Sequence, residues 1–116
     1  MKTLLISLSI LTCTVLFGQE KKLCRTWTIY SITNSEEKVV YKNKGEWGIN
    51  FDCFDHSFLF LTEDGAPNGN GKWEFIKETN SIVMENESEK ETYVIIELKS
   101  KKLVYQWNGR IFTFFR

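Results

Sequence analysis

The stretch from residue 57 to 84 constrains the fold most, because it alternates apolar runs with turn-forming clusters. An apolar run at 58–61 is followed by a cluster at 64–71 that holds three glycines, two asparagines and the only proline of the chain. Two further apolar runs, at 73–76 and 82–84, flank a polar Thr-Asn-Ser turn. Apolar runs that are separated by such turns indicate consecutive antiparallel β-strands, which form a β-meander.

The same reading extends over the rest of the chain. Trp47, Ile49, Phe51 and Cys53 alternate with polar residues, as expected of a strand with one buried face. Asn-Gly at 108–109 is a strong hairpin signal, and no amphipathic helical pattern follows residue 18. Eight or nine short strands favour an all-β, antiparallel up-and-down barrel, because closure removes exposed strand edges. The predicted strands cover residues 21–33, 37–41, 46–54, 57–62, 71–77, 81–85, 92–98, 102–107 and 110–115.

Residues 1–18 have the pattern of a secretory signal peptide. Lys2 precedes an apolar stretch at 4–17, and the small Gly18 marks the expected cleavage site. The stretch is shorter than the roughly 20 residues that a transmembrane helix needs. Acylation at Cys13 is disfavoured, because Thr12 stands where a small residue is expected. We therefore expect a secreted or periplasmic domain at 19–116, with no stable membrane anchor after cleavage.

Charge and motif content exclude several classes of function. Loss of Lys2 leaves 14 Lys and Arg side chains against 15 Asp and Glu, which argues against a nucleic-acid binder. The single His56 and the absence of Cys-x-x-Cys spacing predict no metal site, and the glycine-rich 68–72 segment lacks the spacing of a phosphate loop. Asp52, Asp55, His56 and Ser57 are too close in sequence to converge as a catalytic triad. We expect neither enzymatic activity nor a cofactor.

Cys24 and Cys53 remain after cleavage. An oxidising compartment allows them to form a disulfide. The alternative is a pair of small buried thiols, and the sequence alone leaves both open.

Large aromatic side chains are the candidate binding residues, because a barrel of eight strands is just wide enough for side chains or one small ligand. The alternative is that the tryptophans fill the core or plug the bottom of the barrel, with their N–H groups bonded to the backbone. The residues predicted to line an apolar pocket are Trp27, Trp47, Phe60, Trp73, Phe75, Tyr93 and Tyr105.

Several short motifs follow one another along the chain, namely Leu23-x-x-x-Trp27, Phe58-x-Phe60 before Asp64-Gly65, Gly71-x-Trp73, a polar turn with Ile82, Tyr93-x-Ile95 and Lys102-Leu103-Val104. The order of these landmarks resembles the bacterial lipocalin-like domain family of small exported β-barrels. That family tends to place glycine two residues before the first tryptophan, where this chain has Arg25. The resemblance implies an up-and-down barrel and leaves the activity unspecified.

Two hypotheses about function follow. The first is an exported, non-catalytic lipocalin-like protein that binds a small apolar ligand in the barrel interior. The alternative is a module that binds or inhibits another protein through the loop Glu63–Gly71, since loops on rigid scaffolds often make functional contacts.

Overall fold

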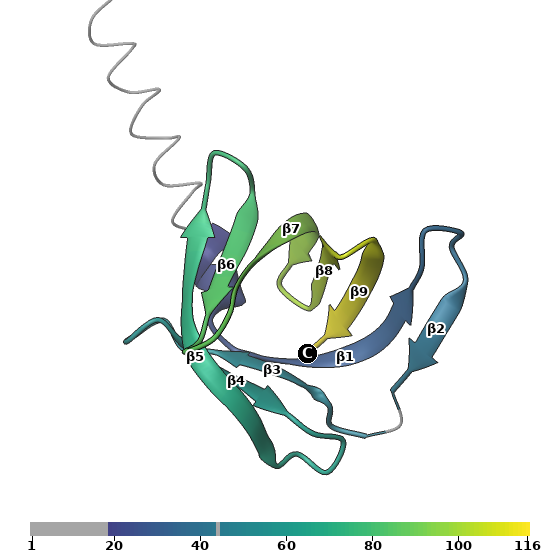
Figure 1. Ribbon diagram of the computed structural model, residues 1–116, viewed down its shortest axis with the longest axis horizontal. Coiled ribbons are helices and arrows are strands. Elements are labelled where there is room, and N and C mark those ends of the chain that lie inside the picture. The colour runs from purple at the N-terminus through teal and green to yellow at the C-terminus, as the bar shows by residue number, and fades with distance from the viewer. Residues whose placement is uncertain (1–18, 44) are drawn as a thin grey trace, which may run out of the picture.

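Nine antiparallel strands make up almost all of the structure, a computed structural model that describes residues 19–43 and 45–116 (Figure 1). The predicted leader and Cys13 lie outside the described residues. Each expected strand is present, with changes at its ends. The strands are β1 (Thr26–Thr33), β2 (Val39–Lys42), β3 (Gly48–Phe51), β4 (Ser57–Leu61), β5 (Pro67–Ile76), β6 (Ser81–Glu85), β7 (Lys90–Lys99), β8 (Lys102–Trp107) and β9 (Arg110–Phe115).

Eight of these strands close into a barrel, which confirms the predicted fold class. From β3 to β9 each strand pairs with the next one in sequence. The first and last strands then meet, because Thr28 pairs with Phe115 and Thr33 with Ile111 across β1 and β9. Closure leaves these eight strands paired on both sides, so the interior is shielded from solvent on all sides except the two ends.

Strands β2 and β3 are the exception to the expected pairing of sequence neighbours, because both pair with β1 and not with each other. Strand β2 pairs with the end of β1, at Ser31–Thr33, whereas β3 pairs with the beginning of the same edge of β1, at Thr26–Thr28. The β1–β2 hairpin therefore extends beyond the barrel as an additional flap (Figure 1). β2 is half-buried or exposed along its length, in keeping with this position.

The prediction that no helix follows the leader is wrong. Residues 19–23 are helical, and a strand was expected from residue 21. Gln19, Glu20, Lys21 and Lys22 all favour helix, and they carry no strand alternation. Leu23, the last helical residue, is completely buried. Tertiary packing of this single apolar side chain places the short helix across one end of the barrel.

The prediction of a long loop at 63–71 is also wrong, because β5 already begins at Pro67. The residues from Pro67 to Gly71 have poor β propensity, but β4 supplies pairing partners, so that Asn70 lies opposite Leu59. A Cβ at Gly71 would collide with the backbone oxygen of Glu85 and the ring of Phe58, which explains the glycine there. Only a short turn at 62–66 is left between β4 and β5.

Candidate ligand cavity at the open end of the barrel

One end of the barrel is closed by tight packing around two tryptophans. Trp27 is fully buried, and its indole Nε1 donates a hydrogen bond to the backbone oxygen of Leu23 at 3.1 Å. Trp73 is 3% exposed, and its Nε1 donates to the backbone oxygen of Asp52 at 2.9 Å. Phe51 packs against Trp73 with their ring centroids 5.3 Å apart. These side chains leave a solid floor at this end.

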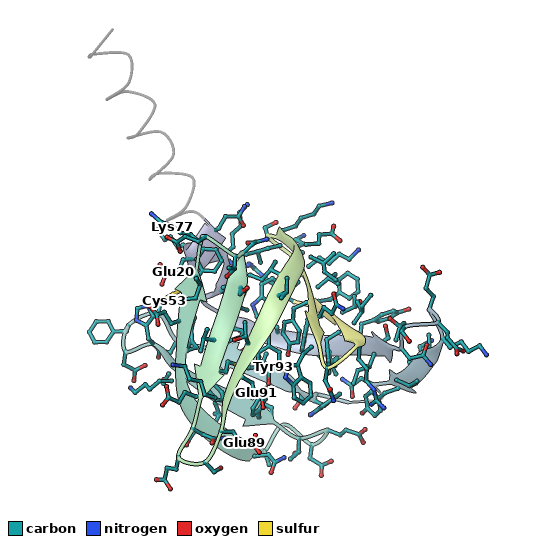
Figure 2. The ribbon with its side chains drawn as sticks, turned by 45° about the horizontal axis from the view of Figure 1, so that its top comes forward. Glu20, Cys53, Lys77, Glu89, Glu91 and Tyr93 are labelled. Carbon is teal, nitrogen blue, oxygen red and sulfur yellow. A yellow bond between two sulfur atoms is a disulfide. The ribbon has the colours of Figure 1, made fainter. Side chains whose placement is uncertain are left out.

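The helix at 19–23 is tied to this floor by covalent and polar contacts. Cys24 and Cys53 form a disulfide, with their Cα atoms 5.3 Å apart. His56 Nε2 lies 2.9 Å from the Glu20 carboxylate, and Arg25 Nη1 donates to the backbone oxygen of Ser100 at 2.6 Å. Figure 2 shows Glu20 and Cys53 together at this end of the barrel. Arg25, at the position where glycine was expected, thus connects the helix to the β7–β8 turn.

The opposite end contains a cavity of about 240 Å³. This volume is slightly below the usual range for pockets that hold drug-sized molecules, so it suits a compact ligand. Its wall is almost entirely apolar and mainly aromatic. The lining residues are Ile29, Trp47, Gly48, Ile49, Phe60, Tyr93, Tyr105, Trp107, Phe112 and Phe114.

Four of the seven predicted pocket residues therefore come together around this cavity, namely Trp47, Phe60, Tyr93 and Tyr105. The other three do not line it. Trp27 and Trp73 belong to the floor, and Phe75 packs against the buried core. That any of the seven contacts a ligand stays a prediction.

The cavity wall on the side of β7, β8 and β9 is a continuous set of packed rings. Tyr93 meets Tyr105 edge to face at 4.9 Å between centroids, and Trp107 stacks on Tyr93 at 5.5 Å. Tyr105 also contacts Phe112 and Phe114 at 5.3 and 5.0 Å. Such mutual packing restricts the rotamers of these side chains, so the wall is formed before a ligand enters.

Two tyrosines, Tyr93 and Tyr105, bring phenol hydroxyls to this wall. Burial, with the nearby Glu91 and Glu89 carboxylates, raises the pKa of Tyr93 to about 12. Burial also raises the pKa of Tyr105 well above its usual value, and the neighbouring Tyr93 adds to the effect. Both phenols are therefore neutral at physiological pH, and each can donate or accept a hydrogen bond.

These raised pKa values predict a loss of stability in alkali. Above pH 10, the tyrosines of the unfolded chain release their protons, whereas Tyr93 and Tyr105 in the folded protein retain them. The folded state then binds more protons, so the free energy of unfolding falls as pH rises from about 10 towards 12. The variant Tyr105→Phe should show a shallower fall, measured by urea unfolding at a series of pH values. An equal slope in both proteins would contradict the burial of this hydroxyl.

A carboxylate stands at the rim of the cavity. Glu91 lies two residues before Tyr93 on β7, and its Oε2 accepts a hydrogen bond from Trp107 Nε1 at 3.1 Å. Figure 2 shows Glu91 and Tyr93 along one strand, at the far end of the barrel from Cys53. The bond fixes the Trp107 ring, and with it one side of the cavity mouth.

A second and larger hollow, of about 850 Å³, lies on the outer surface of β3–β6. Its centre is formed by Asn50, Leu59 and Asn70, which sit beside one another in the ladder. Their neighbours Ile49 and Phe60 line the cavity inside the barrel. The hollow is wide and open to solvent, and most of its lining residues are polar or charged, so it lacks the enclosed apolar wall that is typical of small-molecule sites.

Other kinds of site are not found in the described part of the chain. Within residues 19–43 and 45–116, no three His, Cys, Asp or Glu side chains are placed to share a metal ion. Asp52 and Asp55 accept hydrogen bonds from the backbone of their own turn, at Phe54 and Ser57, and His56 pairs with Glu20. The described residues also contain no helix that is long and apolar enough to cross a bilayer.

The fold is that of a lipocalin-like barrel. A crystal structure of a lipocalin-like protein from Bacteroides uniformis superimposes with a TM-score of 0.64 at 17% identity, covering 82% of this chain and 98% of the other. An uncharacterised protein from Bacteroides eggerthii gives a TM-score of 0.65 at 14% identity, covering 81% and 98%. No family model and no curated protein matches the sequence. At these identities the comparison establishes the fold alone.

Six cavity residues were missed by the sequence analysis. One signal was available for three of them: the Asn108–Gly109 hairpin sets the register of β8 and β9, and alternation then places Phe112 and Phe114 on the same face as Tyr105. Trp107 lies on that face too. No signal distinguished Ile29 or Ile49 from residues of the floor, because the inward face of a strand runs from one end of the barrel to the other. Gly48 falls on the opposite face by alternation, so no signal indicated that it would line the cavity.

Proposed function

We propose that this protein binds a small apolar compound in the cavity at the open end of the barrel and has no catalytic role. One observation carries the proposal: a cavity of about 240 Å³ with an apolar, mainly aromatic lining lies above a floor closed by Trp27 and Trp73. Burial of a ligand's apolar surface there provides the driving force for binding. The packed rings reduce the entropy that is lost on binding.

The lining supports binding rather than catalysis. It consists of aromatic and aliphatic side chains and one glycine, and it includes no pair of nucleophile and base. Export is the second part of the proposal, and it is supported by the leader pattern at 1–18 and by the Cys24–Cys53 disulfide, which persists in an oxidising compartment. In this view the protein is a secreted or periplasmic carrier.

Binding can be tested with N-phenyl-1-naphthylamine, a neutral probe whose fluorescence rises in apolar surroundings. We expect a dissociation constant on the order of 10 µM. The variant Phe60→Arg places a charge in the cavity wall and should weaken binding at least about tenfold, because the charge resists burial.

Leu59→Arg is the matched control. It introduces the same side chain at the next position of β4, on the outer surface, and should bind the probe like the parent protein. Circular dichroism establishes that both variants are folded. If the parent protein fails to bind the probe, or if Leu59→Arg is weakened as much as Phe60→Arg, the cavity is not the binding site.

A further inference from the structure

The rim residue Glu91 is a carboxylate on the inward face of the barrel. Alternation along β7 places Glu91, Tyr93 and Ile95 on one face, and Ile95 is buried in the core. Glu91 pairs across the sheet with Met84, another core residue. The carboxylate is therefore half-buried at the edge of an apolar cavity, where a charged group is costly unless it is paired.

No cation of the described chain neutralises Glu91. The ion pairs among residues 19–43 and 45–116 join Lys38 to Glu36, His56 to Glu20, and Lys99 and Lys102 to Glu97. The one hydrogen bond that Glu91 accepts, from Trp107 Nε1, uses Oε2. A carboxylate offers about four acceptor positions on its two oxygens, so Glu91 retains the capacity for a further donor.

The cavity wall also carries two phenol hydroxyls. The Tyr105 side chain is 3% exposed and lines the cavity, and its ring lies 4.9 Å from that of Tyr93. Within residues 19–43 and 45–116 neither hydroxyl forms a hydrogen bond, and neither oxygen is fully enclosed by protein. Each is therefore available to bond with a ligand in the cavity.

The aromatic wall suits a cation as well as an apolar ring. Indole and phenol faces attract ammonium groups, and the attraction grows as the contact is desolvated. Trp47, Trp107, Tyr93 and Tyr105 surround the same cavity. Rings around one space, with the Glu91 carboxylate bonded to Trp107 at its edge, form an environment that an organic cation satisfies better than a neutral molecule does.

Two turns at the open end carry the same sign of charge as Glu91, whereas the β8–β9 hairpin at this end carries Arg110. The connection between β6 and β7 has Glu87 and Glu89 and is followed by Lys90, and the turn at 62–66 has Glu63 and Asp64 with no basic residue. Figure 2 shows Glu89 and Glu91 at this end of the barrel. Their field favours the approach of cations and opposes that of anions such as carboxylates.

We propose that the cavity selects a small ring compound bearing a protonated amine, with its ring among the aromatic side chains and its ammonium group on the side formed by Glu91, Tyr93 and Tyr105. The inference rests on the proposed function, since it requires the cavity to be a binding site. The inference adds that the ligand is positively charged, a property that an apolar cavity alone does not determine.

Three probes with one ring system test this inference. They are 1-naphthylmethylamine, 1-naphthalenemethanol and 1-naphthoate, measured by isothermal titration calorimetry with the folded mature protein at pH 7. We expect the amine to bind about tenfold more tightly than the alcohol, and the carboxylate to bind most weakly. If the alcohol binds as tightly as the amine while N-phenyl-1-naphthylamine also binds, this inference fails and the proposed function stands. If none of the four compounds binds, both fail.

Glu91→Gln separates charge from shape. Glutamine keeps an oxygen that can accept the Trp107 N–H, so the cavity wall is preserved while the charge is removed. The preference for the amine over the alcohol should fall to about threefold or less, with unchanged affinity for the alcohol. The matched control is Glu78→Gln, an exposed carboxylate in the β5–β6 turn, which should leave all affinities unchanged. An undiminished preference in Glu91→Gln would overturn the assignment.

A second variant, Tyr105→Phe, keeps the ring and removes only the unpartnered hydroxyl. It should weaken binding of the amine about tenfold or more, because a hydrogen bond to a charged group is stronger than one between neutral groups. Equal amine affinities in Tyr105→Phe and the parent protein, with both folded, would also contradict the proposed position of the ammonium group.

Discussion

Replacing Trp27 with alanine is expected to lower the free energy of unfolding by about 3–5 kcal/mol. Trp27 is the largest of the fully buried side chains, and its indole N–H donates a hydrogen bond to the backbone oxygen of Leu23. The substitution removes the centre of the barrel floor and leaves the Leu23 oxygen without its donor, so transfer, cavity and hydrogen-bond losses act together. The change is a large part of the 5–15 kcal/mol that stabilises an ordinary domain.

Phe54→Ala provides the control for this prediction. Phe54 is 99% exposed in the β3–β4 turn, so its loss should change the free energy of unfolding by no more than about 0.5 kcal/mol. Urea unfolding, followed by far-ultraviolet circular dichroism, measures both variants. A loss below about 1 kcal/mol in Trp27→Ala would mean that Trp27 does not fill the floor of the barrel.

Removal of the disulfide is expected to cost about 3–4 kcal/mol, the effect of releasing a loop that spans a sequence separation of 29 residues. The double variant Cys24→Ser, Cys53→Ser should show this loss in urea unfolding. Its cause is the greater freedom of the unfolded chain, together with weaker attachment of the helix at 19–23 to the barrel floor. Because the cavity lies at the opposite end, the double variant should bind N-phenyl-1-naphthylamine normally under conditions in which it is folded.

The parent protein treated with a reducing agent is an independent control, because its sequence is unchanged. It should lose as much stability as the double variant. If the parent is equally stable with and without the reducing agent, Cys24 and Cys53 are not joined in solution, and the alternative of two buried thiols holds instead.

The sequence was sufficient for the strands and their order, because local signals agree with the fold. Asn108 and Gly109 both have positive φ, as the hairpin between β8 and β9 requires, and Asn80 has the same conformation between β5 and β6. Period-two alternation then identified the inward residues of β3, where Ile49 and Phe51 are buried. These features depend only on residues that are close in the sequence.

The parts that were predicted wrongly depend on contacts between distant residues. The glycines and asparagines at 68–71 read as a loop, but pairing with β4 makes them part of a strand. The helix at 19–23 is too short to form alone, and the burial of Leu23 against the barrel stabilises it. The position of β2 depends on which part of the β1 edge is free, and that is decided by the placement of β3.

The candidate site was predicted in part for the same reason. The sequence showed which aromatic side chains point inward, but it did not show to which end of the barrel each belongs. Trp47 and Trp73 both read as inward residues, yet one lines the cavity and the other closes the floor. The helix and the β3–β4 turn determine this difference, because together they cover the end where Trp73 lies.

The four tryptophans offer the most direct test of a barrel with one closed and one open end. The indole N–H groups of Trp47 and Trp107 report on the cavity, and those of Trp27 and Trp73 report on the floor. In an ¹H–¹⁵N correlation spectrum, titration with N-phenyl-1-naphthylamine should shift the Trp47 and Trp107 signals and leave the Trp27 and Trp73 signals in place. Shifts confined to Trp27 and Trp73, or no shift of any indole, would contradict the account.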